Sequence, residues 1–499
     1  MKKLITILSI LMLIVLSGCN TVISDTVKED EDEEVAEAYN LSFNESDTDA
    51  SYQINGSTLI ELGSEDVKIT KGGTYILQGT LDNASVIVEV EKDIDVQLVL
   101  NNATINSGDF AGIYIVEGDE ITITLAEGSV NTISDSSSYT QIDDNNVDAL
   151  IYSKADLIIN GNGTLNLKSD YNHGIVSKDD LVITGGSYNI ETAGQGLSGK
   201  DALMISNGNF KLTTYKDSLK SDNSEDEYRG YVYISGGAFV INSYADAIYG
   251  TSLVNIEGGN FTINTAESNT ADSYKAIKSD NEITISGGTF VINSVDDAIH
   301  SDGDITIDDG SFDIVSSDDA IHADKLVTIN GGDFTIEAHE GIEGTYIKIN
   351  GGDIDISASD DGINAAQKVS DYTATFEMND GNLSVNMGQG DTDAIDSNGY
   401  IYINGGTINI TAQSAFDYDS GAEHNGGTII INGTETDEIT NQFGGGMQGF
   451  GGGMQYGFGG MNQDGNTQNE QNIPGGGQTP PDGQNFTPGS KPGGGNFKH

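Results

Sequence analysis

Residues 297–314 read DAIHSDGDITIDDGSFDI, and residues 319–336 repeat this pattern as DAIHADKLVTINGGDFTI. Both copies hold an Asp-Ala-Ile-His motif, an apolar-Thr-apolar run, a turn with glycine and a Phe-x-Ile run. The equivalent residues Ile277, Ile299 and Ile321 lie 22 residues apart. A repeat this short cannot bury its apolar face alone, so successive copies are expected to stack on one another.

The alternation inside each copy decides the type of secondary structure. Runs such as Ile-Thr-Ile predict short strands with one buried face, and glycine pairs such as Gly287-Gly288 supply the turns between them. A strand that needs a parallel partner one repeat later generates a coil, and parallel crossovers are overwhelmingly right-handed. We therefore predict an all-β protein, with a right-handed parallel β-helix of about 22-residue coils over residues 51–440.

The first 19 residues predict secretion and attachment of lipid. Lys2 and Lys3 precede a short apolar run, and residues 16–19 read Leu-Ser-Gly-Cys. These are features of a signal peptide, and the tetrapeptide is similar to the bacterial lipobox, in which the cysteine carries the lipid. We expect a lipoprotein signal peptide over residues 1–19, a lipid anchor at Cys19, and a location at the extracytoplasmic face of the cell membrane.

Two flanking segments lack the composition of folded protein. Residues 20–50 are acidic and polar, and residues 441–499 are rich in glycine, glutamine, methionine and proline. Chains with so few apolar groups do not bury a core. We predict a flexible acidic tether before the β-helix and a disordered tail after it.

The charge of the chain restricts its partners. There are 78 acidic and 21 basic residues, for a formal net charge of −57. Nucleic acid is excluded as a partner because phosphate binding requires a basic surface. An acidic surface attracts cations instead, and calcium is the abundant hard cation outside cells.

One column of equivalent positions is mostly acidic. Two residues before the repeated apolar residue stand Asp246, Asp297, Asp319, Glu340 and Asp361. Carboxylates stacked about 5 Å apart repel one another by roughly 1 kcal/mol in water. Two interpretations remain open: the side chains accept hydrogen bonds from backbone amides at a turn, or calcium ions lie between them.

A second column points outward and carries hydrogen-bonding side chains. It holds Lys220, Tyr249, Lys278, His300 and His322, one residue after the repeated apolar position. These side chains are candidates to lie along an extended sugar chain, although an ordinary solvated surface has the same composition. His300 and His322 by themselves offer two ligands, which is too few for a transition-metal site.

The Asp-Ala-Ile-x-Ser-Asp and Gly-Gly-x-Phe-x-Ile repeats, the lipobox and the Gly-Met-Gln tail together resemble the bacterial carbohydrate-binding lipoproteins of pectate-lyase-like β-helix fold. This resemblance implies binding of polygalacturonate or cellulose, with calcium on the β-helix and no established catalysis. It places calcium on the matching residues Asp297, Asp302, Asp319, Asp324 and Asp361.

The expected function is therefore calcium-assisted binding of polysaccharide, because divalent ions can bridge an acidic protein to an anionic uronate chain. One alternative is a calcium-dependent polysaccharide lyase, in which Lys278, or else Lys220, takes a proton from the substrate. Carboxylates near a lysine favour its protonated form, which opposes that role. The other alternative is a non-catalytic surface adhesin that binds a protein.

Overall fold

The computed structural model describes residues 38–267, 273–388 and 392–441. These residues form 43 strands, which belong to one mostly parallel sheet, and a single helix, α1 (Glu45–Thr48). The predicted all-β class is confirmed. The predicted signal peptide with Cys19, most of the predicted tether and residues 442–499 lie outside the described residues. Within the described part, no helix is long and apolar enough to cross a membrane.

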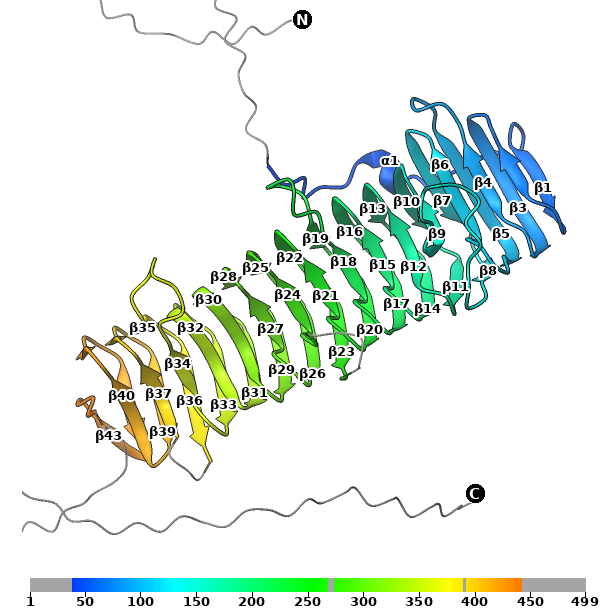
Figure 1. Cartoon of the computed structure of the whole chain (residues 1–499). Helices are drawn as coiled ribbons and strands as arrows, with labels where there is room; N and C mark the ends of the chain where they lie inside the picture. The colour runs from blue at the N-terminus through cyan, green and yellow to red at the C-terminus, as the bar shows by residue number, and fades with distance from the viewer. Residues whose placement is uncertain (1–37, 268–272, 389–391, 442–499) are drawn as a thin grey trace, which may run out of the picture. The chain divides into compact units, whose positions relative to one another are not determined.

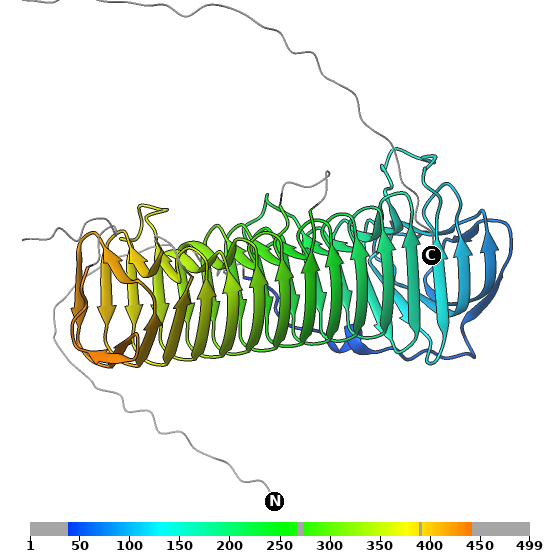
Figure 2. The ribbon, with the colours of Figure 1, turned by 90° about the horizontal axis from the view of Figure 1, so that it is seen from below.

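The sheet is wound into a coil. In the regular part of the chain each strand pairs in parallel with the strand three places later, as β24 (Ile277–Ser279) does with β27 (Ile299–Ser301) (Figure 1). Three strands therefore make one turn, and the strands fall into three stacks that run along the coil (Figure 2). Parallel pairing one turn on is the arrangement that a repeat of 22 residues predicts.

The first stack carries both columns of polar side chains identified in the sequence. Its strands are β2 (Val67–Ile69), β4 (Val86–Glu89), β6 (Ile113–Glu117), β9 (Ala149–Ser153), β12 (His173–Ser177), β15 (Leu197–Gly199), β18 (Leu219–Ser221), β21 (Ile248–Gly250), β24 (Ile277–Ser279), β27 (Ile299–Ser301), β30 (Asp319–Ile329), β32 (Glu340–Ile349), β34 (Ile363–Ala365), β37 (Asp393–Ser397) and β40 (Ser414–Tyr418).

The second stack follows the first along the chain, and the long strands β30 and β32 continue into it. Its other strands are β1 (Thr58–Leu62), β3 (Gly73–Asp82), β5 (Val96–Asn106), β7 (Glu120–Leu125), β10 (Asp156–Gly161), β13 (Asp180–Ile183), β16 (Ala202–Ile205), β19 (Tyr231–Ile234), β22 (Leu253–Ile256), β25 (Glu282–Ile285), β28 (Asp304–Ile307), β35 (Thr375–Met378), β38 (Tyr400–Ile403) and β41 (Gly421–His424).

The third stack completes each turn and ends in an antiparallel pair, β42 with β43. Its strands are β8 (Val130–Ser134), β11 (Thr164–Ser169), β14 (Ser187–Thr192), β17 (Asn209–Thr214), β20 (Ala238–Ser243), β23 (Asn260–Thr265), β26 (Thr289–Ser294), β29 (Ser311–Ser316), β31 (Asp333–Ala338), β33 (Asp353–Ala358), β36 (Asn382–Met387), β39 (Thr407–Thr411), β42 (Thr428–Ile431) and β43 (Thr434–Thr436).

The core is a set of stacked side chains inside the coil. Aromatic rings of the third stack lie face to face, with centroids 4.5–4.8 Å apart and planes within 2–4° of parallel. A glycine stands two residues before each phenylalanine. Gly288 shows why glycine is needed there: its φ is +118°, and an added Cβ would lie 3.1 Å from the Phe290 ring. The stacked residues are Tyr188, Phe210, Phe239, Phe261, Phe290, Phe312 and Phe334.

The register of the repeated apolar column agrees with the sequence from Ile175 onward, through Ile277, Ile299 and Ile321. The first member is different. The spacing predicts Leu150 as the partner of Ile175, whereas the structure pairs Ile175 with Ile151. Residues 149–153 are all buried, so inward and outward positions cannot be told apart there by hydrophobicity.

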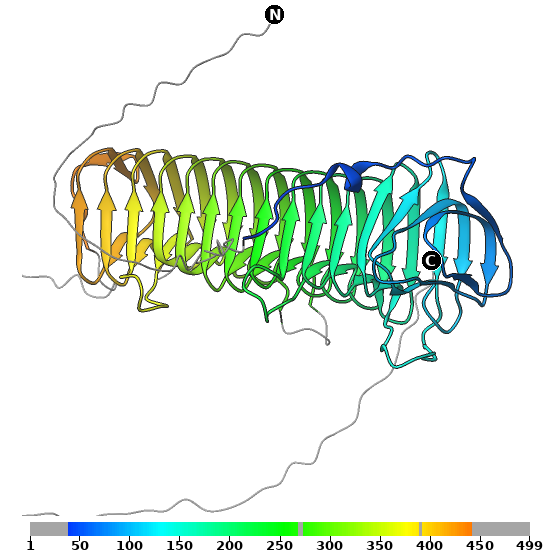
Figure 3. The ribbon, with the colours of Figure 1, turned by 90° about the horizontal axis from the view of Figure 1, so that it is seen from above.

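Residues 38–49 correct the predicted tether, which was expected to stay flexible as far as residue 50. This segment packs along the second stack, with α1 beside β10 (dark blue in Figure 3). Phe43 stacks on Tyr233 at 5.4 Å, and the Asp47 carbonyl accepts a hydrogen bond from Thr184 Oγ1 at 2.7 Å. Its three apolar side chains Tyr39, Leu41 and Phe43 alternate in sequence, which lets one face bury on the coil.

Candidate functional site

The outward column forms a continuous line on the first stack, called here the side-chain row. Lys220, Tyr249, Lys278, His300 and His322 are partners in successive turns. The same register continues through Glu343, Asn364, Asp396 and Asp417. The row is partly sheltered, because the side chains of Lys278 and His322 are only 22% and 12% exposed.

The acidic column runs beside this row and is called here the acid ladder. In it, one carboxylate oxygen accepts the backbone N–H of the ladder residue one turn later. Asp246 Oδ1 accepts from Lys275 N at 2.8 Å, Asp297 Oδ1 from Asp319 N at 3.1 Å, and Asp361 Oδ1 from Asp393 N at 3.0 Å. The backbone-capping interpretation is confirmed at these positions, and it leaves the second oxygen of each carboxylate for other contacts.

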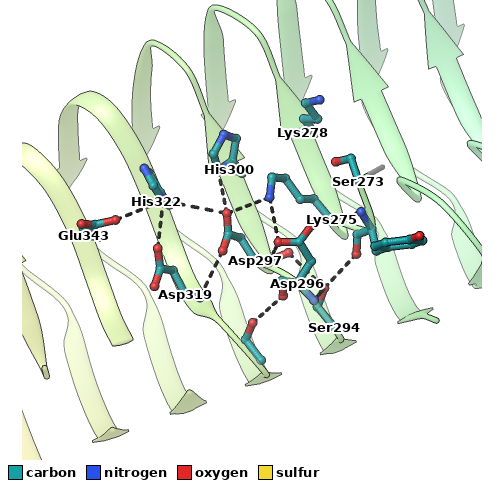
Figure 4. A network of polar contacts seen from close by, with 12 residues as sticks. Ser273, Lys275, Lys278, Ser294, Asp296, Asp297, His300, Asp319, His322 and Glu343 are labelled. Atoms are coloured by element: carbon teal, nitrogen blue, oxygen red, sulfur yellow. Dashed lines mark hydrogen bonds and ion pairs between the residues drawn. The ribbon is translucent and has the colours of Figure 1, made fainter. Parts of the chain in front are cut away.

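In the middle of the ladder, Asp297 is surrounded by nitrogen atoms (Figure 4). Its Oδ2 lies 2.7 Å from His300 Nδ1, 3.0 Å from Lys275 Nζ and 3.8 Å from His322 Nδ1. The Asp297 side chain is 5% exposed. Burial by itself raises the pKa of this carboxyl, but His300, Lys275 and His322 outweigh burial and hold the pKa well below its ordinary value.

His322 lies in the same network, but carboxylates surround it where nitrogen atoms surround Asp297. Its Nδ1 is 2.8 Å from Asp319 Oδ2 and 3.2 Å from Glu343 Oε2. Burial alone lowers the pKa of the imidazole, but Asp319, Glu343 and Asp297 overcome this effect and raise it. The three carboxylates therefore favour the charged form of His322.

The far nitrogen of each imidazole faces another predicted calcium ligand. His300 Nε2 lies 3.0 Å from Asp302 Oδ1, and His322 Nε2 lies 3.4 Å from Asp324 Oδ1. With Asp297 and Asp319 at Nδ1, four of the five residues that the resemblance assigns to calcium are in contact with histidine. Their assignment to calcium stays a prediction.

The fifth predicted ligand, Asp361, has different surroundings. Burial, together with the neighbouring charges of Asp360, Asp393 and Asp417, raises its pKa to about 6. For Asp396, which is paired in register with Asp417, burial and the charges of Asp361, Asp417 and Asp393 raise the pKa to about 7. Groups of carboxylate oxygens without nitrogen ligands suit a hard cation such as calcium.

The first lysine of the row is held by carboxylates and by an aromatic ring. Lys220 Nζ lies 3.0 Å from Asp217 Oδ2, and the amines of Lys220 and Lys278 lie 5.2 and 5.1 Å from the centroid of the Tyr249 ring. Burial alone lowers the pKa of Lys220, but Asp217 and Asp222 outweigh it and raise the pKa. Lys220 is therefore held in its charged form, which binds anions and does not take up a proton.

Sequence reasoning did not predict the contacts of three residues of this site. Lys275 stands in the acid ladder, yet its amine turns to Asp296 and Asp297, at 2.8 and 3.0 Å. Glu343 contacts both His322 and Lys368, the latter at 2.7 Å. The spacing Asp-x-x-His signals only the contacts inside one turn, Asp297 with His300 and Asp319 with His322. No signal in the sequence points to the contacts of Lys275 and Glu343 between turns.

A second polar region lies on the second stack, away from the row. A pocket of about 450 Å³ is lined by Asp180, Tyr228, Tyr231 and Arg229, which is the sole arginine of the chain. Arg229 Nη1 lies 3.7 Å from Asp180 Oδ1. Burial first, and then the charge of Asp156, raise the pKa of Asp180 to about 7 despite the arginine.

Comparison with known proteins places the chain among carbohydrate-binding proteins. Residues 63–320, 302–394 and 338–470 match the family described as carbohydrate-binding domain-containing protein. A protein of that description from Acetivibrio thermocellus is 35% identical over 231 residues, which are 46% of this chain and 78% of the relative.

Among solved structures, a gadolinium derivative of the polysaccharide lyase-like protein from C. thermocellum is 30% identical and covers 48% of this chain and 97% of its own, with a TM-score of 0.41. The family match extends over most of the chain, and it includes the turns that carry the side-chain row. The chain therefore belongs to the family of carbohydrate-binding domain-containing proteins.

Proposed function

We propose that this protein binds an acidic polysaccharide of the polyuronate type, or cellulose, outside the cell, along the side-chain row of a right-handed parallel β-helix anchored by lipid at Cys19. The observation that carries the proposal is the register of the row. Lys220, Tyr249, Lys278 and His300 follow one another at single-turn intervals. An extended chain of pyranose sugars has a repeat close to the strand spacing of about 4.8 Å, so successive sugars meet successive turns.

The two ends of the row suggest how an anionic sugar chain is held. The ammonium groups of Lys220 and Lys278 offer direct contacts to uronate carboxylates, while the ring of Tyr249 between them offers an apolar face. At the other end, Asp396 and Asp417 of the row, with Asp361 of the acid ladder beside them, repel an anion. We propose that calcium binds these carboxylates and supplies the positive charge that bridges protein and substrate.

The test is a pull-down of the full chain on insoluble polygalacturonate and on cellulose, with and without a calcium chelator. Tyr249→Ala and Lys278→Ala are expected to weaken binding at least tenfold, because they remove the central contacts of the row. Lys168→Ala is the matched control, since Lys168 is 55% exposed on the third stack. Unchanged binding by both row variants would overturn the proposed surface, and retention on polygalacturonate in chelator would overturn calcium bridging.

The proposal includes no catalysis. A lyase base must be a free amine near neutral pH, and the carboxylates around Lys220 raise the pKa of that amine. Incubation with polygalacturonate, followed by ultraviolet absorbance, tests this point directly. Unsaturated product that disappears in Lys278→Ala would make the protein a lyase. Failure to retain any glycan on an array would favour an adhesin for a protein partner.

A further inference from the structure

Two histidines and three carboxylates converge at the middle of the first stack. They are Asp297, His300, Asp319, His322 and Glu343, from the turns that carry β27, β30 and β32. The register that brings His300 and His322 together also brings Glu343 beside His322. We propose that this cluster, called here the histidine cluster, is a binding site for one divalent transition metal ion of the zinc type.

The distances between the ligand atoms fit such an ion. Zinc binds nitrogen and oxygen at about 2.0–2.1 Å with tetrahedral geometry, so its ligand atoms lie roughly 3.3 Å from one another. His322 Nδ1 lies 3.2 Å from Glu343 Oε2 and 3.8 Å from Asp297 Oδ2. Asp297 Oδ2 in turn lies 2.7 Å from His300 Nδ1. Asp297, His300 and His322 offer ligand atoms within 4.8 Å of one another, and Asp319, His322 and Glu343 form a second such group that shares His322. Three protein ligands therefore surround one position, as in zinc sites that keep the fourth place for water.

The surroundings of the two imidazoles also match those of metal ligands. A histidine that binds metal through one nitrogen usually donates its other N–H to a carboxylate, which fixes the ring. Here Nδ1 of both rings faces the cluster. His300 Nε2 is hydrogen-bonded to Asp302 Oδ1 at 3.0 Å, whereas His322 Nε2 lies 3.4 Å from Asp324 Oδ1 without forming a hydrogen bond. In the acid ladder, Asp297 is fixed further by its hydrogen bond from Asp319 N.

The ligand set selects against calcium. Imidazole nitrogen suits zinc, copper and nickel, whereas calcium takes six to eight oxygen ligands. The histidine cluster offers two nitrogens from side chains that are 13% and 12% exposed. When the ion binds, it replaces any proton on Nδ1 of each imidazole, and those protons pass to the solvent. This inference is independent of the proposed polysaccharide binding.

The test is calorimetric titration of the metal-stripped full chain, made without a polyhistidine tag, with ZnCl₂ in the presence of excess CaCl₂. One zinc ion per chain is expected. His322→Ala is expected to weaken binding by more than about 100-fold, and Asp302→Asn by about tenfold, as for residues that orient a ligand. His424→Ala is the matched control, because His424 lies on β41 of the second stack and belongs to none of the groups of potential metal ligands among the described residues.

A second measurement needs no variant. Cobalt(II) bound in place of zinc absorbs strongly in the visible region when four or five ligands surround it, and weakly when six waters do. An intense band that saturates at one equivalent and is abolished by zinc supports the site. Zinc binding that survives in His322→Ala, loss of binding in His424→Ala, or displacement of zinc by calcium would each overturn it.

Discussion

The central and the C-terminal sections of the first stack use the same two columns for different chemistry. Around Asp297, acid ladder and side-chain row alternate in charge, with Lys275, His300 and His322 beside the carboxylates. Around Asp361, the acid ladder holds Glu340, Asp361 and Asp393, and the row holds Asp396 and Asp417 after Asn364. The parallel register is the same in the two sections, so the side chains of the row decide whether imidazole nitrogen or mainly carboxylate oxygen faces a cation.

The largest difference between the two sections is expected in the free energy of unfolding when a ladder carboxylate is removed. Asp297→Ala removes the acceptor of His300 Nδ1 and leaves Lys275 with Asp296 as its remaining acid, so we expect a loss of about 3 kcal/mol in the free energy of unfolding. Asp361→Ala loses one backbone hydrogen bond but also relieves like-charge repulsion, so we expect less than about 1 kcal/mol. Urea denaturation without divalent ions measures both, and equal losses would show that the sections do not differ electrostatically.

Calcium is expected to stabilise only the C-terminal section. At a concentration of 100 times its dissociation constant, a ligand that binds only the folded state adds about 2.7 kcal/mol. We expect this gain in the wild-type protein and in His322→Ala, and its loss in Asp361→Asn/Asp396→Asn. Calorimetric melting with and without calcium measures the shift. A calcium-induced shift in melting temperature that vanishes in His322→Ala would place the ion in the central section and contradict this prediction.

Asp180 on the second stack is a further buried acid, and its cationic neighbour is the guanidinium group of Arg229. Its pKa is raised to about 7, mainly by burial and then by Asp156, against about 3.9 in the unfolded chain. The folded state therefore binds the proton more tightly, and stability falls as pH rises from about 4 to about 7. We expect a change of roughly 1–2 kcal/mol after screening by solvent.

Denaturation midpoints at pH 5 and pH 7.5 measure this effect. Asp180→Asn is expected to remove it, while Asp313→Asn, which replaces an exposed acid on the third stack, serves as the control. A pH dependence of the same size in Asp180→Asn would assign the effect to other carboxyl groups.

The smallest change in stability is expected at Tyr249, whose ring contacts the amines of two lysines of the row. Tyr249→Leu removes the ring between the amines of Lys220 and Lys278, and each cation–π contact at a partly exposed site contributes about 0.5–1 kcal/mol. We expect a loss of about 1 kcal/mol for Tyr249→Leu, and less for Tyr249→Phe, which keeps the ring but loses the hydrogen bond to Asp280 Oδ2 at 2.8 Å. Thermal melting of the two variants compares them, and equal losses would assign the effect to the hydroxyl group.

Much of this arrangement was predictable because the repeat in the sequence is also the repeat in space. The 22-residue spacing of Ile277, Ile299 and Ile321 correctly predicted that they stack, and it placed His300 beside His322. Prediction failed at Leu150, where five consecutive buried residues give no inward and outward alternation. It also failed at residues 38–49, because their docking on β19 and β22 depends on contacts with residues almost 200 positions away.

The sequence by itself determined the strands, their spacing and the two polar columns, because period and alternation act locally and are copied from turn to turn. Only the tertiary structure decided which atoms of those columns meet. Lys275 turns to Asp296 and Asp297, and Glu343 closes on His322. Such contacts depend on burial, on side-chain direction and on charges from neighbouring turns, and none of these is contained in the spacing of residues along the chain.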